Sequence, residues 1–374
     1  MSFTLGNIKG EFKLCPSLPE ASSNASAAVL NEKIYLIGGC DRKGQLVSTV
    51  YRLDENSWTE DAPLPNPLAK PAILVINGKI IAVGGIINSH DASDRVEVFD
   101  GENWTTQSLL PEGLMGIAAV SISDTEGIIM GGMGPDTCAR DTVRKITWNK
   151  GSKLPRWVNL IPMPTSRYDL QVTLYGNSIF AVGGRCGKQP VGAVESFDIE
   201  LNQWTSWMNI PSPTALSSFG CSRGMLVVAA GLRANHDGFC KKVSFLDITK
   251  KASISDWTGQ RRWSLLEARG SCQTCSIDGW FINLGGINND GKPSDKIETI
   301  NLREPASRFQ PLPNVPYPIA CATTLLTKDS FYLFGGISSF GPTSSCFKVY
   351  FERDPNCILF DDLANKTPSG IDPA

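Results

Sequence analysis

The chain has 374 residues, which is enough for two average domains or one large array of repeats, and long enough to bury a substantial core. Its 35 Lys and Arg residues nearly balance its 37 Asp and Glu residues, and no run of like charge stands out, which argues against nucleic-acid binding and against a polybasic membrane anchor. No window approaches the roughly 18 continuous apolar residues of a transmembrane helix, so we expect no membrane partner.

The amino terminus, MSFTLGNIKGEFKL, lacks the apolar stretch of about 7–15 residues that a signal peptide requires. We therefore expect a cytoplasmic protein, and we interpret its 11 cysteines as reduced thiols rather than as a disulfide framework. Gly and Pro are somewhat more frequent than average, which favours many turns over long helices.

The first strand with a distinctive end is KIYLIGG, residues 33–39, and related segments recur along the chain. In each of them an apolar run stops at two small residues, usually glycines. Apolar alternation over about four to seven residues recurs throughout, whereas the spacing of an amphipathic helix is nowhere sustained. The chain is therefore predicted to be a repeat array of short β-strands. The first small residue of each pair, at intervals of 46 to 55 residues, is Gly38, Gly84, Gly131, Gly183, Ala230, Gly285 and Gly335.

Each unit carries further marks after its glycine pair. A second apolar strand often ends in Asp, as in VYRLD (50–54) and VEVFD (96–100), and a Trp follows after a short loop, as at Trp58, Trp104 and Trp204. The double glycine, the Asp-ended strand and the spaced Trp resemble the kelch repeat over nearly the whole chain. The resemblance implies a β-propeller, in which four-stranded antiparallel blades surround a central channel.

We therefore predict an all-β fold: a seven-bladed kelch β-propeller that occupies residues 1–351, with 352–374 as a carboxy-terminal strand or tail. Each unit is too short to bury both faces of its sheet alone, so it must stack on its neighbours. The glycines suit sharp turns or close backbone approaches, and the Trp side chains fill the space between blades. Both are interpreted as scaffold.

The amino-terminal segment is predicted to close the ring. Phe12 lies ten residues before Ser22, the offset at which a Trp precedes the next inner strand in the first four repeats, and Leu18-Pro19 stands at the place of a recurring LP dipeptide. The last repeat has no Trp after its third strand, CFKVYF. Residues 11–16 thus complete blade seven as its outer strand. The alternative is that NCILFDDL, residues 356–363, takes this place.

The topology places the loops between the second and third strands, and the starts of the inner strands, on one face at the channel mouth. Arginines open the inner strands of blades four and six, and others follow the glycine pairs of blades four and five. In the kelch domains of ubiquitin-ligase adaptors, arginines at matching places bind acidic peptides, and the resemblance implies the same role here. The candidate ligand-binding residues are Arg167, Tyr168, Arg185, Arg233, His236 and Arg269. The alternative is that the arginines are solvated and pair with Glu195, Asp198 or Asp169.

Other candidate sites are weaker. His90 and His236 follow glycine pairs at the same offset but on distant blades, and a turn explains them without a metal, so we expect no metal and no cofactor. Strand alternation would point Cys272 and Cys275 to opposite faces, which argues against a zinc or redox role. Five other cysteines are placed in the loop region after the second strand, where they are either buried and inert or sensitive to oxidants: Cys40, Cys138, Cys186, Cys240 and Cys346.

Two classes of function remain open at this point. The first is a protein-interaction module, a scaffold that binds a peptide or protein partner, with acidic segments favoured, at the channel mouth. The second is a metal-independent enzyme with acid/base chemistry of the epimerase, mutarotase or cyclase type, in which the arginines hold a small anionic substrate and Glu195, Tyr168 or His236 moves protons. A deep pocket containing a carboxylate with a shifted pKa would favour the enzyme.

Overall fold

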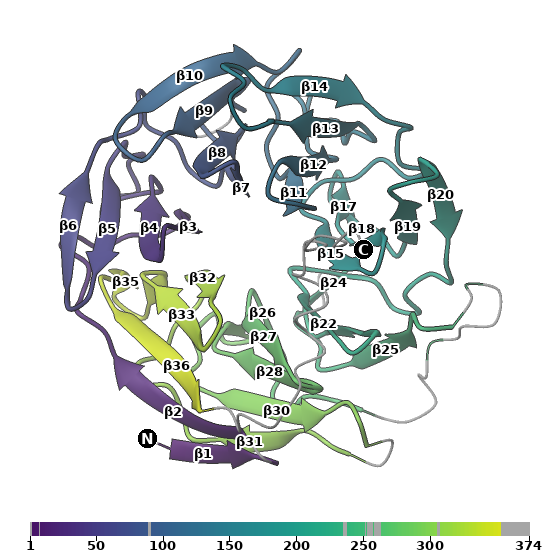
Figure 1. Cartoon of the computed structure of the whole chain (residues 1–374). Helices are drawn as coiled ribbons and strands as arrows, with labels where there is room; N and C mark the ends of the chain where they lie inside the picture. Colours follow the sequence, from purple (N-terminus) through teal and green to yellow (C-terminus); the bar gives the residue numbers. More distant parts are fainter. Residues whose placement is uncertain are drawn as a thin grey trace, which may run out of the picture.

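A computed structural model describes residues 2–6, 8–88, 91–234, 238–250, 252, 257, 263–304 and 307–352 of the chain. Its elements are β-strands, which form small antiparallel sheets arranged around a common centre as a seven-bladed β-propeller (Figure 1). This confirms the predicted fold class. Within these residues, no helix has the length and apolar character that crossing a membrane requires.

The main strands follow the order expected for a propeller, with each blade running from the channel outward. Blade one contains β3 (Ser26–Leu30), β4 (Lys33–Ile37), β5 (Val50–Asp54) and β6 (Ser57–Asp61); blade two, β7 (Ala72–Ile76), β8 (Lys79–Val83), β9 (Arg95–Phe99) and β10 (Trp104–Leu109); blade three, β11 (Ala118–Ser121), β12 (Glu126–Met130), β13 (Val143–Thr147) and β14 (Arg156–Asn159); and blade four, β15 (Gln171–Tyr175), β16 (Ser178–Val182), β19 (Val194–Asp198) and β20 (Gln203–Ser206).

The remaining blades follow the same plan. Blade five contains β22 (Ser218–Ser222), β23 (Met225–Ala229) and β25 (Val243–Asp247); blade six, β27 (Gln273–Ile277), β28 (Trp280–Leu284), β30 (Ile297–Asn301) and β31 (Gln310–Leu312); and blade seven, β32 (Thr323–Leu326), β33 (Ser330–Phe334), β36 (Cys346–Glu352), β2 (Ile8–Leu14) and β1 (Ser2–Leu5). In blade five, Trp257 bridges Leu246 at the outer position. Short strands near the channel are β17 (Arg185–Cys186), β18 (Gln189–Pro190), β21 (Thr214–Ala215), β24 (Leu232–Arg233), β26 (Arg269–Gly270), β29 (Ile287–Asn288), β34 (Ile337–Ser338) and β35 (Gly341–Pro342).

Two-residue turns join several inner strands to their neighbours. Asn77-Gly78 connects β7 to β8, and Asp278-Gly279 connects β27 to β28. All four residues have positive φ, as the type I′ turn requires, because this turn matches the right-handed twist of the strands that it joins. These local signals set the length of these hairpins and hence the register of the strands that they join.

The core of the protein lies between blades rather than within one central mass. The described residues form seven clusters of buried apolar side chains, and each cluster joins two adjacent blades. The expected role of the Trp residues is confirmed. Trp58 of blade one packs edge-on against Phe334 of blade seven, and its indole N–H donates to the carbonyl of Pro16 at 2.9 Å. Each blade is therefore held by its two neighbours.

The amino terminus closes the ring, as predicted. Strand β2 pairs with β36 in an antiparallel register that places Phe12 opposite Val349. Figure 1 shows β1 and β2 at the outer edge of blade seven, beside β36. The strand spans 8–14 rather than 11–16, because the apolar alternation continues upstream, and β1 adds a fifth strand that sequence reasoning missed. The rival closing segment, 356–363, and nearly all of the expected tail lie outside the described residues.

Candidate functional site: the channel mouth and the junction of blades four and five

One residue from each blade occupies an equivalent place at the start of the inner strand. All seven residues have a left-handed backbone, with φ between 49° and 64°. Only one of them is glycine, so the remaining six each carry a conformational cost of about 1 kcal/mol. Backbone hydrogen bonds between neighbouring blades offset part of this cost, such as that from Lys70 N–H to the Asn24 carbonyl at 2.9 Å. We call these residues the inner ring: Asn24, Lys70, Gly116, Asp169, Leu216, Ser271 and Cys321.

A second set of hydrogen bonds joins each glycine pair to the next blade. At six junctions, the N–H of the second glycine donates to the carbonyl of the residue that opens the next inner strand, at 2.7 to 3.1 Å. The donors are Gly39, Gly85, Gly132, Gly231, Gly286 and Gly336. Among the described residues, Gly184 of blade four makes no equivalent bond to Thr214 of blade five. Thr214 is instead tied to its own blade, because its hydroxyl donates to the Ala230 carbonyl at 2.7 Å.

The space around the first glycine of each pair also distinguishes the junction of blades four and five from the others. A Cβ atom on this residue would lie 2.0 to 2.4 Å from a carbonyl oxygen of the next blade at the five other glycine positions. At Gly183, the nearest atom would be Cδ1 of Ile210, at 3.7 Å. The outer part of this junction still packs, since Val182, Ile210 and Val228 share one apolar cluster. The junction of blades four and five is therefore open only at its channel edge.

Two matched variants test this opening. Gly38 and Gly183 have nearly the same φ, 58° and 62°, but a Cβ at Gly38 would lie 2.2 Å from the Leu68 carbonyl oxygen. We expect Gly183→Ala to lower the free energy of unfolding by about 1 kcal/mol from backbone strain alone. We expect Gly38→Ala to cost about 1–3 kcal/mol more, from overpacking. Equal losses in urea denaturation would contradict an open junction.

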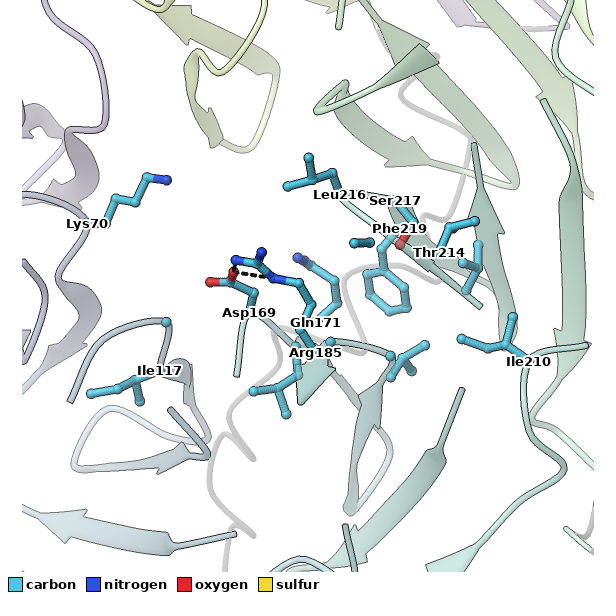
Figure 2. Close-up of a pocket in the computed structure, with 17 residues that line it drawn as sticks. Lys70, Ile117, Asp169, Gln171, Arg185, Ile210, Thr214, Leu216, Ser217 and Phe219 are labelled. Atoms are coloured by element: carbon cyan, nitrogen blue, oxygen red, sulfur yellow. Dashed lines mark hydrogen bonds and ion pairs between the residues drawn. The ribbon is translucent and has the colours of Figure 1, made fainter. Parts of the chain in front are cut away.

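A cavity of about 340 Å³ occupies the open junction. Polar and apolar surfaces contribute about equally to its walls, and the charged side chains of Lys70, Asp169 and Arg185 lie on one side of it (Figure 2). The apolar side chains are those of Ile117, Leu170, Val182, Ile210, Leu216, Phe219 and Val228, and the polar ones are those of Lys70, Asp169, Gln171, Arg185, Thr214 and Ser217. A second cavity, of about 270 Å³, shares Lys70, Gln171, Leu216 and Ser217 with it and extends along the inner ring. The opening thus communicates with the central channel.

Charge at the cavity is unevenly distributed. The guanidinium group of Arg185 pairs with the carboxylate of Asp169 and lies over the ring of Tyr168, 4.8 Å from its centroid. Lys70, which is exposed, comes from blade two, and Figure 2 shows its ammonium end extending toward the side of the channel where Arg185 lies. The described lining therefore carries two positive side chains and one negative one, and Lys70 supplies the excess charge.

The structure separates the arginines that the sequence placed together. Arg167 and Arg269 are fully buried, and each lies inside its own blade rather than at the mouth. Arg167 pairs with Glu195 at 2.7 Å, and Arg269 pairs with Glu298 at 2.5 Å. Burial lowers the pKa of Arg167, although the charge of Glu195 opposes this shift. The expectation that these two side chains face the channel mouth is wrong: both turn into their own blades, where each meets a carboxylate of the third strand.

The other candidate ligand-binding residues lie in different environments. Tyr168 is buried, with its hydroxyl donating to the Gly187 carbonyl at 2.6 Å, so it supports the β17–β18 hairpin beneath Arg185. Arg233 is exposed on β24, and its backbone pairs with Thr214 at the cavity edge. His236 lies outside the described residues, as does His90. Of the five candidates that the structure describes, only Arg185 lines the cavity. Sequence reasoning missed Lys70, Gln171, Leu216 and Ser217, although aligning the inner-strand starts would have found the inner ring.

The metal-binding groups and cysteines considered in the sequence do not form a second functional site among the residues that the structure describes. No group of three or more His, Cys, Asp or Glu side chains suited to a metal ion occurs in the described part of the chain. Cys275 packs toward blade seven, whereas Cys272 contacts Ser218 of blade five, so the two thiols do face opposite neighbours. Burial raises the pKa of Cys272. Two of the cysteines expected in loops, Cys240 and Cys346, are buried, and Cys346 begins β36.

Comparison with known proteins agrees with this architecture. A family model described as the Kelch motif matches residues 21–65, 67–106 and 166–206. Kelch domain-containing protein 8B of Homo sapiens is 28% identical over 165 residues, 43% of this chain and 46% of that protein. Alpha-scruin of Limulus polyphemus is 24% identical over 252 residues, 65% of this chain and 27% of that protein. The chain thus spans less than half the length of these relatives. The solved structure of YjhT superposes with a TM-score of 0.58 at 16% identity, covering 80% of this chain and 100% of YjhT, which shows likeness of fold.

Proposed function

We propose that this β-propeller, which contains three matches to the Kelch motif, is a protein-interaction module that binds a peptide segment of a partner at the channel mouth. In this proposal the segment carries an apolar side chain next to an acidic residue. The apolar side chain enters the cavity between blades four and five, and the acidic residue faces Lys70. The observation that carries the proposal is the opening at this one junction, where the hydrogen bond of Gly184 to the next blade is missing among the described residues.

The chemistry of the cavity suits such a segment. Burying an apolar side chain there would contribute about 1.5–3 kcal/mol, which is roughly a 10- to 100-fold gain in affinity. The backbone N–H of Gly184 and the hydroxyl of Ser217 lie in the lining and are suited to hydrogen bonds with a peptide main chain. The excess positive charge of Lys70 favours a negative neighbour on the partner. The blades on either side hold these groups in place before the partner arrives, which lowers the entropic cost of binding.

The cavity is less well suited to acid/base catalysis. Such chemistry needs an acid and a base within reach of one substrate. Among the described lining residues the titratable groups are Lys70, Asp169 and Arg185, and Asp169 is held in its ion pair with Arg185. Glu195, another candidate for moving protons, is buried against Arg167 and Thr165 instead. The described groups therefore favour binding over an enzyme acting on a small anion.

Two mouth variants and one control test the proposal. Ser217→Trp would fill the cavity, and Lys70→Glu would reverse the charge beside it. Lys150→Glu makes the same charge change in the exposed loop between β13 and β14, which lies on the opposite face. Partners recovered from native extract on the immobilised wild-type chain are quantified by mass spectrometry and compared across the variants. We expect a partner whose recovery falls about tenfold with both mouth variants and is unchanged with Lys150→Glu. Retention of every partner by Ser217→Trp and Lys70→Glu would refute binding at this cavity.

A further inference from the structure

A pair of cysteines lies where the two ends of the described chain meet in blade seven. Cys15 directly follows β2, and Cys346 is the first residue of β36. The backbone N–H of Cys15 donates to the carbonyl of Cys346 at 3.0 Å, which extends the β2–β36 ladder by one residue. Residues opposed in this way have Cα atoms about 5.5 Å apart, and a disulfide spans about 4.4–6.8 Å. The backbone is therefore already placed for a bond between the two sulfur atoms.

The side chains of the two cysteines are also in contact. Both side chains belong to the same apolar cluster, and the two thiols and the Lys348 ammonium lie close enough that each thiol shifts the pKa of the other and Lys348 acts on both. The Cys346 thiol, followed by the Lys348 charge, lowers the pKa of Cys15, whereas the same thiol contact raises the pKa of Cys346. Cys15 is half-buried and Cys346 is buried, in the apolar cluster that joins blades seven and one. One member of the pair is thus accessible and activated, and the other is protected behind it.

We propose that Cys15 and Cys346 form an oxidation site at which a hydroperoxide converts the two thiols to a disulfide that locks the propeller ring. The Cys15 thiolate attacks one oxygen of hydrogen peroxide, the O–O bond breaks, and the departing hydroxide takes a proton to become water. The sulfur of Cys346 then attacks the sulfenic acid of Cys15. The S–S bond forms, the S–O bond breaks, and a second water leaves with the proton of Cys346. Two thiols lose two electrons, and the peroxide is reduced to two waters.

The consequence of the bond follows from its place in the fold. In the reduced protein, β2 is held to β36 by non-covalent contacts: the hydrogen bonds of the ladder, apolar packing, the Lys9–Glu352 ion pair and the Lys13 ammonium over the Tyr350 ring. The disulfide would join residues at nearly opposite ends of the described chain, and a crosslink around so long a loop restricts the unfolded state strongly. It would also prevent β2 from leaving blade seven. The inference is independent of the proposed partner site, which lies on other blades.

The test treats the full chain with excess hydrogen peroxide and then removes the oxidant. Peptide mapping without reductant is expected to show a peptide linked through Cys15 and Cys346, lighter by two hydrogens than the separate peptides. The thermal midpoint is expected to rise by roughly 5 °C, and dithiothreitol should reverse the shift. Cys15→Ser should abolish both effects at little cost to the reduced protein, because this side chain is half-buried. Cys138→Ser, which removes an exposed thiol of blade three, should change neither.

Either of two results would overturn the inference. The first is oxidation of Cys15 to sulfinic or sulfonic acid with no linked peptide, which would show that Cys346 cannot reach it. The second is an equal rise in thermal midpoint for the wild-type chain and Cys15→Ser, which would place the stabilising oxidation at other thiols.

Discussion

A chain that lacks residues 2–14 is expected to lose cooperative folding. These residues form β1 and β2, and their side chains Phe3, Leu5, Ile8 and Phe12 are buried in the cluster between blades six and seven. Burial of each contributes about 1.5–3 kcal/mol, so the four together contribute roughly 6–12 kcal/mol. The whole stability of a folded protein is typically about 5–15 kcal/mol. The deletion would also leave β36 as an unpaired edge, which promotes aggregation.

Peptide rescue distinguishes an open ring from a chain that simply fails to fold. The truncated chain is expected to show no cooperative thermal transition by circular dichroism, or one at a much lower temperature. Adding a synthetic peptide of residues 2–14 should restore part of the transition, because the peptide can occupy the vacant edge of β36. The control Lys13→Ala alters an exposed side chain of β2 and should change stability by less than about 0.5 kcal/mol. An unchanged transition in the truncated chain would show that the amino-terminal strands do not hold the ring closed.

The second large effect is expected from the buried ion pair of blade four. Glu195→Ala should lower the free energy of unfolding by about 3–5 kcal/mol, because it leaves the Arg167 guanidinium buried without its counter-charge. Arg167 would keep its hydrogen bonds to the carbonyls of Ala193 and Ala181, but these do not neutralise it. Thr165, whose hydroxyl donates to Glu195 at 2.6 Å, would also lose its acceptor.

A matched control and a double variant make this measurement specific. Glu200→Ala removes an exposed carboxylate from the same blade and should change the free energy of unfolding by less than about 0.5 kcal/mol in urea denaturation. Combining Glu195→Ala with Arg167→Met removes both charges and should recover a large part of the loss. Blade two indicates that such a replacement is compatible with the fold, because Leu68 occupies the position of Arg167 there. If Glu195→Ala lowered the free energy of unfolding by less than about 1 kcal/mol, the Arg167–Glu195 ion pair could not be shielded from water as the structure indicates.

Most of the fold was predictable from the sequence because its signals are local and repeated. The paired glycines mark the end of the second strand in six of the seven blades, and their positive φ values explain why other residues are disfavoured there. Closure by the amino terminus followed from the offset of Phe12 and the absent Trp in the last repeat. The extra strand β1 was missed, because Phe3 and Leu5 alternate over too short a stretch to distinguish a strand from an extended end.

The candidate site was only partly predictable. Sequence position placed Arg167 and Arg269 at the start of inner strands and Arg185 just after a glycine pair, but it could not show which way each side chain turns. A single step along a strand reverses the face that a residue presents, and Arg167 and Arg269 point into their blades, toward Glu195 and Glu298. Arg185 and Lys70 lie in the cavity lining, although they come from blades that are distant in sequence.

The sequence by itself determined the seven repeats, their strand pattern and the closing of the ring, since short-range alternation and turn chemistry are written within each unit. Only the tertiary structure decided that the junction of blades four and five stays open beside the channel and that Cys15 meets Cys346. Both depend on how far apart residues of different blades come to rest. That separation is set by the packing of all the blades against one another, which no local stretch of sequence specifies.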